Sequence, residues 1–365
     1  MTEHKKLNIH MLGISMYTKD LYEMLNIDFD GKNNIFATGN TDRRFYSLRK
    51  ENFFSNPVET GKPTHLFSPR FFCLLYASNK VFFHGLFSFA RVVFFFFQPW
   101  LWKKCYWIVW GGDLYSARKS PVRAADKIKE WMKKQMIPRL AGVITLTEGD
   151  QQLVKDWYGF SGKFYQTSYP IPLQSVGMKE RLANRMNLKK EWINIVIGNS
   201  ATVTNQHMEV LDKLSKFKDQ NIHIYIPLAY GNGEWKAYSQ KVCDYAYGIF
   251  SRDKVTPIID RMSGEEYTEF MRKMHIAIYN NNRQQAMGNI AIMLAVGAKV
   301  YIRTDTTMWD HYQLLNQKLY DVMKIDGMSF EEFIDYPEEE YKYNFDVLYE
   351  RNDRQKIVAK WKNIL

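Results

Sequence analysis

The chain has 365 residues, more than one hydrophobic core usually organises, so about two domains are expected. Hydrophobic residues make up 46% and charged residues 24% of it, which excludes a disordered, collagen-like or coiled-coil protein. Lys and Arg number 50 against 39 Asp and Glu, a formal net charge of +11 that favours anionic partners. Of these partners we rank nucleic acid last, because no known nucleic-acid-binding module is recognisable.

The cysteines and the apolar segments bear on the compartment. The three cysteines lie far apart, which argues against a disulfide framework or a metal site and favours a reducing cytoplasm. The polar start, residues 1–6, is unlike a signal peptide. The apolar segment 86–102 is interrupted by Arg91, Gln98 and Pro99, whereas a membrane span needs roughly 20 apolar residues. We therefore expect no transmembrane helix.

Strand-like and helix-like patterns alternate along the chain, as is typical of a mostly parallel α/β protein. In the first half, we expect strands near residues 7–12, 34–37, 80–84, 106–110, 142–146 and 163–166, with helices near 87–103, 121–139 and 149–158. In the second half, we expect strands near 193–197, 222–227, 255–259, 275–279 and 299–302, with helices near 206–217, 233–250, 264–273 and 283–296.

A short proline-containing segment, residues 169–172, is the candidate linker between the halves, because each proline fixes its own φ and restricts the residue before it. The expected boundaries are 1–170, 171–335 and a helical tail, 336–365, that packs back on the first domain. Two doubly wound halves indicate the GT-B arrangement, in which two Rossmann-like domains face each other across a cleft. Ligands are then expected at the carboxyl ends of the strands.

Two strand ends in the second half carry small and polar residues. Gly198, Asn199 and Ser200 follow one expected strand, and a helix is expected to open near Asn205. Small residues let backbone amides approach a phosphate, although an ordinary capped turn has the same composition. Tyr230 and Gly231 follow the next strand and suit a nucleobase or a ribose.

A third strand end in this half gives the strongest signal. Asn280 is followed by Arg283, Gln284 and Gln285, and then by Gly288 and Asn289 in the expected helix. A guanidinium, carboxamides and free backbone amides at a helix start can hold a diphosphate. Arg283 could instead be a solvated residue, but a cation at a helix N-terminus opposes the macrodipole and so invites an anion.

In the first half, His84 and Gly85 end one strand, and Trp110, Gly111, Gly112, Asp113 and Tyr115 end the next. Asp113 is a candidate general base, and His84 is a candidate for that role or for orienting a sugar. The structural alternatives are a helix cap for Asp113 and a hydrogen-bonded buried histidine for His84. Glu148 is a third acidic candidate, for which a capping role is more common.

These segments resemble one family, the 4-acetamido-4,6-dideoxygalactose (Fuc4NAc) transferases of glycosyltransferase family 56, which act on enterobacterial common antigen. The resemblance runs through FFHGLF (82–87), WIVWGGDLY (107–115), IVIGNSATVTNQH (195–207), PLAYG (227–231), RQQAMGN (283–289) and the region of Trp309. The sequence departs from the family at Ala201 and Thr202, where Gly and Asp are expected, and over the first sixty or so residues.

The resemblance implies a hexosyltransferase with a GT-B fold, a dTDP-sugar donor and no metal or other cofactor. It also implies an undecaprenyl-diphosphate-linked glycan acceptor and a peripheral location on the cytoplasmic side of the bacterial inner membrane. Residues 1–170 would then face the acceptor and the membrane, and residues 171–335 would bind the donor. Two alternatives stay open. One is a glycosyltransferase using another nucleotide sugar in O-antigen or capsule assembly, and the other is a non-catalytic membrane-surface protein that binds nucleotide sugars.

On this interpretation, Asp113, His84 and Arg283 are the candidate catalytic residues. The expected donor contacts are Gly198, Asn199, Ser200, Asn205, Tyr230, Gly231, Asn280, Arg283, Gln284, Gln285, Gly288 and Asn289. The expected acceptor contacts are His84, Gly85, Trp110, Gly111, Gly112, Asp113, Tyr115 and Glu148. For contact with an anionic membrane, the candidates are Phe94, Phe95, Phe96, Trp100 and Trp102, beside a basic stretch that includes Lys133 and Lys134. The alternative is that these phenylalanines belong to the core.

Overall fold

The computed structural model describes residues 7–13, 16–29, 33–38, 57–59, 66–118, 123–171, 192–231 and 233–365. Contacts divide the chain into two compact units. The N-terminal unit comprises Met1–Ile171 and Asp353–Leu365, and the C-terminal unit comprises Pro172–Asn352. The change of unit after Ile171 falls one residue beyond the expected boundary, although Pro172 itself lies outside the described residues.

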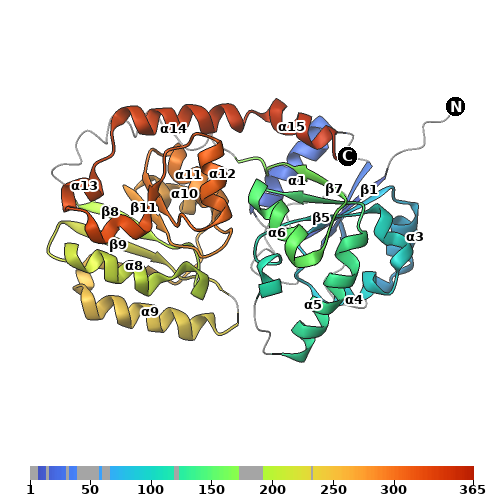
Figure 1. The fold of residues 1–365 in the computed structure, drawn as a ribbon, viewed down its shortest axis with the longest axis horizontal. Coiled ribbons are helices and arrows are strands. Elements are labelled where there is room, and N and C mark those ends of the chain that lie inside the picture. The colour runs from blue at the N-terminus through green and yellow to red at the C-terminus, as the bar shows by residue number, and fades with distance from the viewer. Residues whose placement is uncertain are drawn as a thin grey trace. The chain divides into compact units, whose positions relative to one another are not determined.

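The N-terminal unit is built on a seven-stranded sheet with the order β3-β2-β1-β4-β5-β6-β7, in which all neighbouring strands are parallel (Figure 1). The strands are β1 (Asn8–Leu12), β2 (Asn34–Thr38), β3 (Pro57–Glu59), β4 (Lys80–His84), β5 (Cys105–Ile108), β6 (Gly142–Thr145) and β7 (Lys163–Gln166). All five residues of β1 are buried, as expected for a strand covered on both faces.

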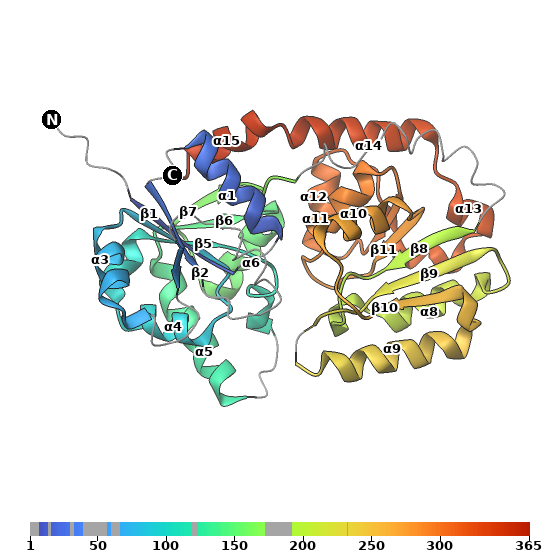
Figure 2. The same cartoon turned by 180° about the vertical axis from the view of Figure 1, so that it is seen from behind.

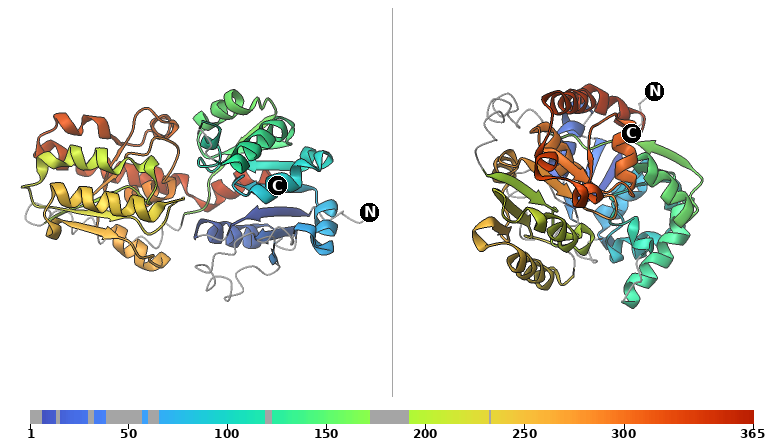
Figure 3. Two further views of the ribbon diagram at one scale, coloured as in Figure 1. Left: turned by 90° about the horizontal axis from the view of Figure 1, so that it is seen from below. Right: turned by 60° about the vertical axis from the view of Figure 1, so that its left-hand side comes forward.

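Helices cover both faces of this sheet. One face packs against α3 (Pro69–Ala77), α4 (Phe89–Phe96), α5 (Ala124–Met136) and α6 (Glu148–Tyr158). The other face packs against α1 (Met16–Asp28) and α15 (Arg354–Lys362). Figure 3 shows the blue helix α1 and the green helices on opposite sides of the sheet. The loops after β4, β5 and β6, which carry the expected acceptor residues, all lie at the carboxyl end of the sheet.

The expected helix near 87–103 is two shorter elements. The α-helix α4 ends at Phe96, and a 3₁₀ helix, η4 (Pro99–Lys104), follows it, because Pro99 has no backbone N–H to continue the ladder. The side chains of Phe94, Phe95 and Trp102 are 6, 1 and 7% exposed, so they belong to the core and not to an interfacial face. Trp100 is 61% exposed. The prediction that Phe94, Phe95 and Trp102 contact a membrane was therefore wrong.

The C-terminal unit is built on a six-stranded parallel sheet with the order β10-β9-β8-β11-β12-β13 (Figure 2). The strands are β8 (Ile193–Ile197), β9 (Ile222–Pro227), β10 (Val255–Ile258), β11 (Ile276–Tyr279), β12 (Lys299–Ile302) and β13 (Tyr320–Asp321). Because β8 lies between β9 and β11, the loops that follow these three strands meet at one edge of the sheet, where α/β proteins bind ligands.

Seven helices follow in this part of the described chain: α8 (His207–Leu214), α9 (Trp235–Ile249), α10 (Gly264–Arg272), α11 (Met287–Ala295), α12 (Thr307–Leu314), α13 (Phe330–Ile334) and α14 (Glu338–Arg351). Residues of α8, α9 and α13 pack on one face of the sheet. The helix expected to open at Arg283 begins instead at Met287, because Ala286 adopts a left-handed conformation with φ of 61°. Arg283, Gln284 and Gln285 therefore lie in the loop that leads into α11.

The expected tail divides between the two units. Helix α14 belongs to the C-terminal unit, whereas α15 belongs to the N-terminal unit. Trp361 of α15 is fully buried and donates from its indole nitrogen to the carbonyl of Ser168 over 3.3 Å. Lys80 at the start of β4 donates to the carbonyl of Ile364 over 2.6 Å. Of the two helices of the expected tail, only α15 thus packs on the N-terminal sheet. No helix in the described ranges has the length and apolar character needed to cross a bilayer.

Candidate functional site

The loop after β8 is tightly built around a glycine. Gly198 has φ of +68°, and a Cβ there would lie 2.3 Å from Nε2 of His207, so a larger residue would be strained in both respects. The backbone N–H of Asn199 donates to Oδ1 of Asn205 over 3.0 Å. The side-chain nitrogen of Asn205 donates to the carbonyl of Ser200 over 2.9 Å and to Oγ1 of Thr202 over 2.7 Å. Asn205 is 1% exposed, so it holds the loop and does not face a ligand in this conformation.

The loop after β11 is hydrogen-bonded to the loop after β8. Nε2 of Gln285 donates to Oδ1 of Asn199 over 2.9 Å, and Oγ1 of Thr204 donates to Oε1 of Gln285 over 2.8 Å. Nδ2 of Asn281 also donates to Oδ1 of Asn199, over 3.5 Å. Asn199 and Gln285, two residues expected at the site, are therefore in contact although they lie far apart in the sequence.

Helix α11 begins two residues beyond Gln285, at Met287. Its first turn has no acidic residue and no side-chain cap, and Gly288 lies in that turn. The first four N–H groups of a helix have no partner within it, so this end favours an anion. Arg283 is half-buried, and its Nη1 donates to the carbonyl of Gln284 over 2.8 Å. A guanidinium and a helix N-terminus thus belong to the same short loop.

Tyr230 and Gly231, after β9, border the same loops. The Tyr230 hydroxyl accepts from Nδ2 of Asn199 over 3.4 Å, and the guanidinium of Arg261 lies 5.2 Å from the Tyr230 ring centroid. A Cβ on Gly231 would lie 2.2 Å from the carbonyl oxygen of Ala201, so the close approach of the two loops requires glycine. Tyr230 is 42% exposed, which leaves an aromatic face accessible.

The expected donor residues fall into two groups by exposure. Accessible or half-buried members, which a ligand could contact, are Asn199, Tyr230, Gly231, Arg283, Gln285 and Gly288. Buried members, which support the loops, are Gly198, Ser200, Asn205, Asn280, Gln284 and Asn289. We therefore correct the expectation that all of them face a donor.

Several residues that support these loops were not predicted from the sequence. Nδ2 of Asn280 donates to Oε2 of Glu209 over 2.9 Å, and Arg303 donates to the same carboxylate oxygen over 3.4 Å while it also pairs with Asp305. His207 is fully buried, and burial lowers its pKa to about 3. Its Nδ1 lies 3.0 Å from the Tyr238 hydroxyl, whereas its Nε2 has no hydrogen-bond partner. No local motif marks these residues, because their partners come from other elements.

In the N-terminal unit, Asp113 lies 2% exposed at the centre of the loop after β5. Its Oδ2 accepts from the indole nitrogen of Trp107 over 2.6 Å and from the backbone of Leu86 over 2.8 Å. Its Oδ1 accepts from the backbones of Trp110 over 2.9 Å and Leu114 over 3.1 Å. Each carboxylate oxygen thus accepts two hydrogen bonds, so the acceptor positions of the carboxylate are occupied by donors of the protein. The geometry argues for a residue that positions the loops after β4 and β5, against the expected general base.

Lys133 of α5, which contacts this loop, is fully buried. Its ammonium donates to the carbonyl of Asp113 over 2.7 Å and pairs with Oε1 of Glu130 over 2.6 Å. Burial lowers the pKa of Lys133. This lysine supports the Asp113 loop from within, so the expectation that it belongs to a basic surface was wrong.

His84, at the end of β4, is 5% exposed and has partners at both ring nitrogens. Nδ1 lies 2.6 Å from the Tyr169 hydroxyl, and Nε2 lies 3.2 Å from Nδ1 of His10. Nε2 of His10 lies 3.2 Å from Oδ1 of Asn34, an acceptor, so His10 donates there and accepts from His84. His84 in turn accepts from Tyr169, which accepts from the indole of Trp110 over 2.9 Å.

These histidines are held neutral. Burial lowers the pKa of His10 to about 4, and burial together with His10 and Arg91 holds the pKa of His84 well below its ordinary value. His84 has no free lone pair in this chain of hydrogen bonds. It therefore orients the neighbouring loops, which agrees with the structural alternative for this residue.

The remaining acceptor candidates lie around these two residues. Gly85 and Gly111 are buried, whereas Trp110, Gly112 and Tyr115 are half-buried. Glu148 is the first residue of α6, for which Thr147 provides the cap. It is half-buried, and its Oε1 accepts from Gln166 over 2.5 Å. Within the described residues, no group of three or more His, Cys, Asp or Glu side chains is arranged to hold a metal ion.

The family model for the 4-alpha-L-fucosyltransferases of glycosyl transferase group 56 matches residues 76–335, well over half of the chain. The chain belongs to this family. It is thus a glycosyltransferase, as the sequence resemblance implied, and the match includes every expected site residue.

The transferase is also similar to solved structures. HepE from Anabaena, in complex with UDP and glucose, has 9% identity over 98% of each chain and a TM-score of 0.69. An α,α-trehalose 6-phosphate synthase from Burkholderia multivorans has 9% identity over 99% of this chain and 97% of that chain, with a TM-score of 0.62. At this identity the likeness concerns the fold alone, and it confirms the expected GT-B class.

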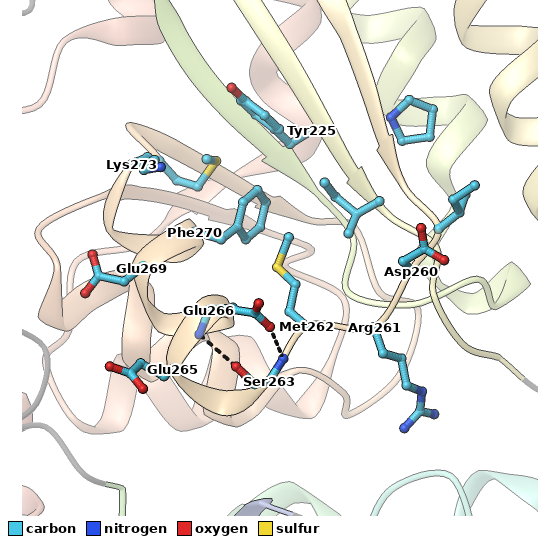
Figure 4. Close-up of a pocket in the computed structure, with 14 residues that line it drawn as sticks. Tyr225, Asp260, Arg261, Met262, Ser263, Glu265, Glu266, Glu269, Phe270 and Lys273 are labelled. Atoms are coloured by element: carbon cyan, nitrogen blue, oxygen red, sulfur yellow. Dashed lines mark hydrogen bonds between the residues drawn. The ribbon is translucent and has the colours of Figure 1, made fainter. Parts of the chain in front are cut away.

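The transferase also has an open cavity of about 880 Å³ beside the edge strand β10 and helix α10, and its lining includes Arg261, whose guanidinium lies 5.2 Å from the Tyr230 ring centroid. Figure 4 shows Tyr225, Met262 and Phe270 around it, with Asp260, Glu265 and Glu269 at its margin and the capping pair Ser263 and Glu266 below. None of the expected donor residues lines this cavity.

Proposed function

We propose that this transferase moves a deoxy amino sugar of the Fuc4NAc type from a dTDP-sugar to an undecaprenyl-diphosphate-linked oligosaccharide. The product would enter a bacterial surface glycan such as enterobacterial common antigen. The observation that carries the proposal is the contact between Asn199 and Gln285. Gln285 lies two residues before the uncapped start of α11. HepE in complex with UDP-glucose lends support to a nucleotide-sugar donor.

The C-terminal unit would hold the donor. When the bond between the sugar and the diphosphate breaks, negative charge grows on the β-phosphate, and donors fixed in place beforehand stabilise it. The backbone amides of the first turn of α11 and the guanidinium of Arg283 are such donors. Tyr230, with its exposed ring, would stack on the base or contact the ribose.

The N-terminal unit would hold the acceptor at the loops after β4, β5 and β6. Because Asp113 and His84 are saturated with hydrogen bonds, we assign them to positioning. Glu148, half-buried at the start of α6, would receive the proton of the acceptor hydroxyl. A polyprenyl acceptor stays in the bilayer, so the enzyme would work as a peripheral protein on the cytoplasmic side of the inner membrane.

Thermal shifts with dTDP, UDP and GDP test the donor, because a ligand that binds the folded state raises the melting temperature. We expect the largest shift with dTDP. Arg283→Ala should reduce this shift, whereas substitution of Lys241, an exposed lysine on α9, by Ala should retain it as the matched control. A larger shift with UDP or GDP would favour the alternative of another nucleotide sugar.

A transfer assay with a dTDP-sugar and a lipid-linked acceptor tests the reaction, with mass analysis of the product. Formation of a product one deoxy amino sugar heavier is expected. Nucleotide binding without any transfer would favour the second alternative, a non-catalytic protein that binds nucleotide sugars at the membrane surface.

A further inference from the structure

An exposed aromatic surface lies on the helices α3, α4 and α5, which cover one face of the N-terminal sheet (Figures 1 and 2). We call it the aromatic face. Its members are Phe67, Tyr76, Phe89, Phe97, Trp100, Ile128 and Trp131, with exposed fractions of 65, 50, 41, 67, 61, 46 and 55%. Large exposed apolar patches are uncommon on soluble proteins and usually mark a contact surface.

Two sets of contacts link side chains of the aromatic face. On α4, Phe89, Val93 and Phe96 are less buried than Val92 and Phe95, which gives an outer stripe with spacings of four and three. Two ring contacts extend this stripe, one of 5.3 Å between Phe96 and Trp131 on α5 and one of 5.4 Å between Phe96 and Phe97.

On the other side, the indole of Trp100 donates to the Tyr76 hydroxyl of α3 over 3.0 Å. The ring of Tyr76 stacks on Phe72 at 6.2 Å, and Phe72 lies 6.4 Å from Phe67. The half-buried ring of Phe72 thus joins the exposed rings of Tyr76 and Phe67.

The charges around the aromatic face are almost all positive. In α3, α4, η4 and α5, the only acidic residues are Asp126 and Glu130. Asp126 pairs with Arg123 and Lys129, and Glu130 pairs with the buried Lys133. The exposed cations on these elements and just after α5 include Arg70, Lys103, Lys127, Lys134 and Arg139. On α5, Lys127 and Lys134 flank Trp131 at spacings of four and three, so all three share one side of the helix.

We propose that the aromatic face docks the N-terminal unit on an anionic phospholipid bilayer. Tryptophan and tyrosine favour the interface between headgroups and acyl chains, and each nearby cation strengthens attraction to anionic lipid. The charge pattern selects a lipid surface as the partner. This inference deepens the proposed function and rests on it for the lipid-linked acceptor.

The position of α4 relates this surface to the acceptor loops. Ser88, at the end of the loop that follows β4, caps α4. The outer stripe therefore begins next to the proposed acceptor region. The eight residues of α4 extend about 12 Å at 1.5 Å per residue. Docking along this stripe would bring the loop after β4 to the membrane surface, where a polyprenyl-linked sugar is located.

The test is co-sedimentation of the full chain with vesicles of phosphatidylglycerol and phosphatidylcholine, and with vesicles of phosphatidylcholine alone. Lys127→Glu/Lys134→Glu should lower the partition coefficient for the anionic vesicles on the order of 10- to 100-fold. Trp100→Ala/Trp131→Ala should lower partitioning into both kinds of vesicle and remove a blue shift of tryptophan fluorescence. The matched control is Lys236→Glu/Lys241→Glu on α9, which makes the same charge change on exposed lysines of the other unit.

Further readouts separate this proposal from the proposed function. The vesicle variants should keep the dTDP-induced thermal shift and transfer to a short-chain, detergent-soluble acceptor, and lose transfer only to an acceptor held in vesicles. If wild-type protein binds no dTDP, the vesicle measurement still decides the docking surface. Equal vesicle binding by variants and wild type would overturn the proposal, as would a wild-type dimer that these substitutions dissociate, because a second copy would then cover the face.

Discussion

Gln285 donates from Nε2 to Oδ1 of Asn199 over 2.9 Å, which joins the loop after β11 to the loop after β8. The same nitrogen lies 3.3 Å from Oγ of Ser200 and 3.4 Å from Oγ1 of Thr202. The amide nitrogen of Gln285 thus faces three oxygen atoms of the neighbouring loop, and its Oε1 accepts from a fourth, Oγ1 of Thr204. The relative position of the two loops, and with it the proposed donor site, depends on this side chain.

Gln285→Glu should raise the donor KM at least tenfold. The substitution places a carboxylate oxygen against Oδ1 of Asn199, which cannot donate, and adds negative charge next to the proposed diphosphate position. Gln285→Ala should have a smaller effect, about three- to tenfold, since it removes hydrogen bonds of about 1 kcal/mol without adding repulsion. Steady-state kinetics with varied donor measure this, with Gln240→Glu on α9 as control. A donor KM that Gln285→Glu leaves unchanged would rule out contact between these loops and the donor.

Asp113→Asn tests the positioning role of the buried carboxylate. All four hydrogen bonds to this carboxylate come from N–H groups, so the amide NH₂ of Asn must point at a donor. We expect a loss of about 2–4 kcal/mol in the free energy of unfolding, because a buried charge-assisted network is broken. Turnover should fall along with stability. Urea denaturation and turnover measure the two effects.

Asp156→Asn is the matched control, because Asp156 is an exposed acid of the same unit that accepts one hydrogen bond from Gln152. It should change the unfolding free energy by less than about 0.5 kcal/mol. A fully stable Asp113→Asn protein whose turnover is 10² to 10⁴ times lower would reverse our assignment and identify Asp113 as the proton acceptor.

Most of the strands and the polar loops could be predicted from the sequence, because both leave local patterns, whereas the short edge strands β3 and β13 were not predicted. The apolar run Ile193–Ile197 and the Gly198 turn that follows are an example: a buried parallel strand needs the first, and a positive φ favours the second. The start of α11 was misplaced by four residues, since a left-handed Ala286 has no sequence signature.

Burial and hydrogen-bond partners could not be predicted from the sequence. The run Val92–Phe97 is uniformly apolar, and only the packing of α4 on the sheet decides that Phe95 is core while Phe97 is 67% exposed. Asp113 takes partners from the end of β4 and from the side chain of Trp107. In the sequence Lys133 cannot be distinguished from the neighbouring surface lysines, whereas in the structure it is buried and paired with Glu130. Such contacts depend on segments that are distant in the sequence.

The buried histidines predict acid sensitivity. In the unfolded chain a histidine takes up a proton near its ordinary pKa of 6.5, whereas the folded state resists protonation down to about 4 at His10 and about 3 at His207. The unfolded state therefore binds more protons, and stability falls as the pH decreases from about 6.5 towards 4. Each such histidine contributes up to about 1.4 kcal/mol per pH unit.

Urea denaturation at pH 7, 6, 5 and 4 measures this slope. His207→Asn, which keeps a polar atom near the position of Nδ1, should give a shallower slope than wild type between pH 6.5 and 4. An identical slope in wild type and variant would mean that His207 is not held neutral by the fold.

Arg283→Ala should lower both dTDP affinity and turnover, with turnover reduced on the order of 10²- to 10³-fold, the usual effect of removing one preorganised donor. The loop at residues 283–286 leads directly into the uncapped first turn of α11, so the guanidinium and the helix amides would act on the same anion. Arg283→Lys should recover little, because an ammonium keeps the charge but loses the planar pair of donors. Titration calorimetry with dTDP, beside single-turnover rates, separates binding from chemistry. If Arg283→Ala binds dTDP and transfers sugar as wild type does, the diphosphate lies elsewhere, and the loops after β8 and β11 are not the donor site.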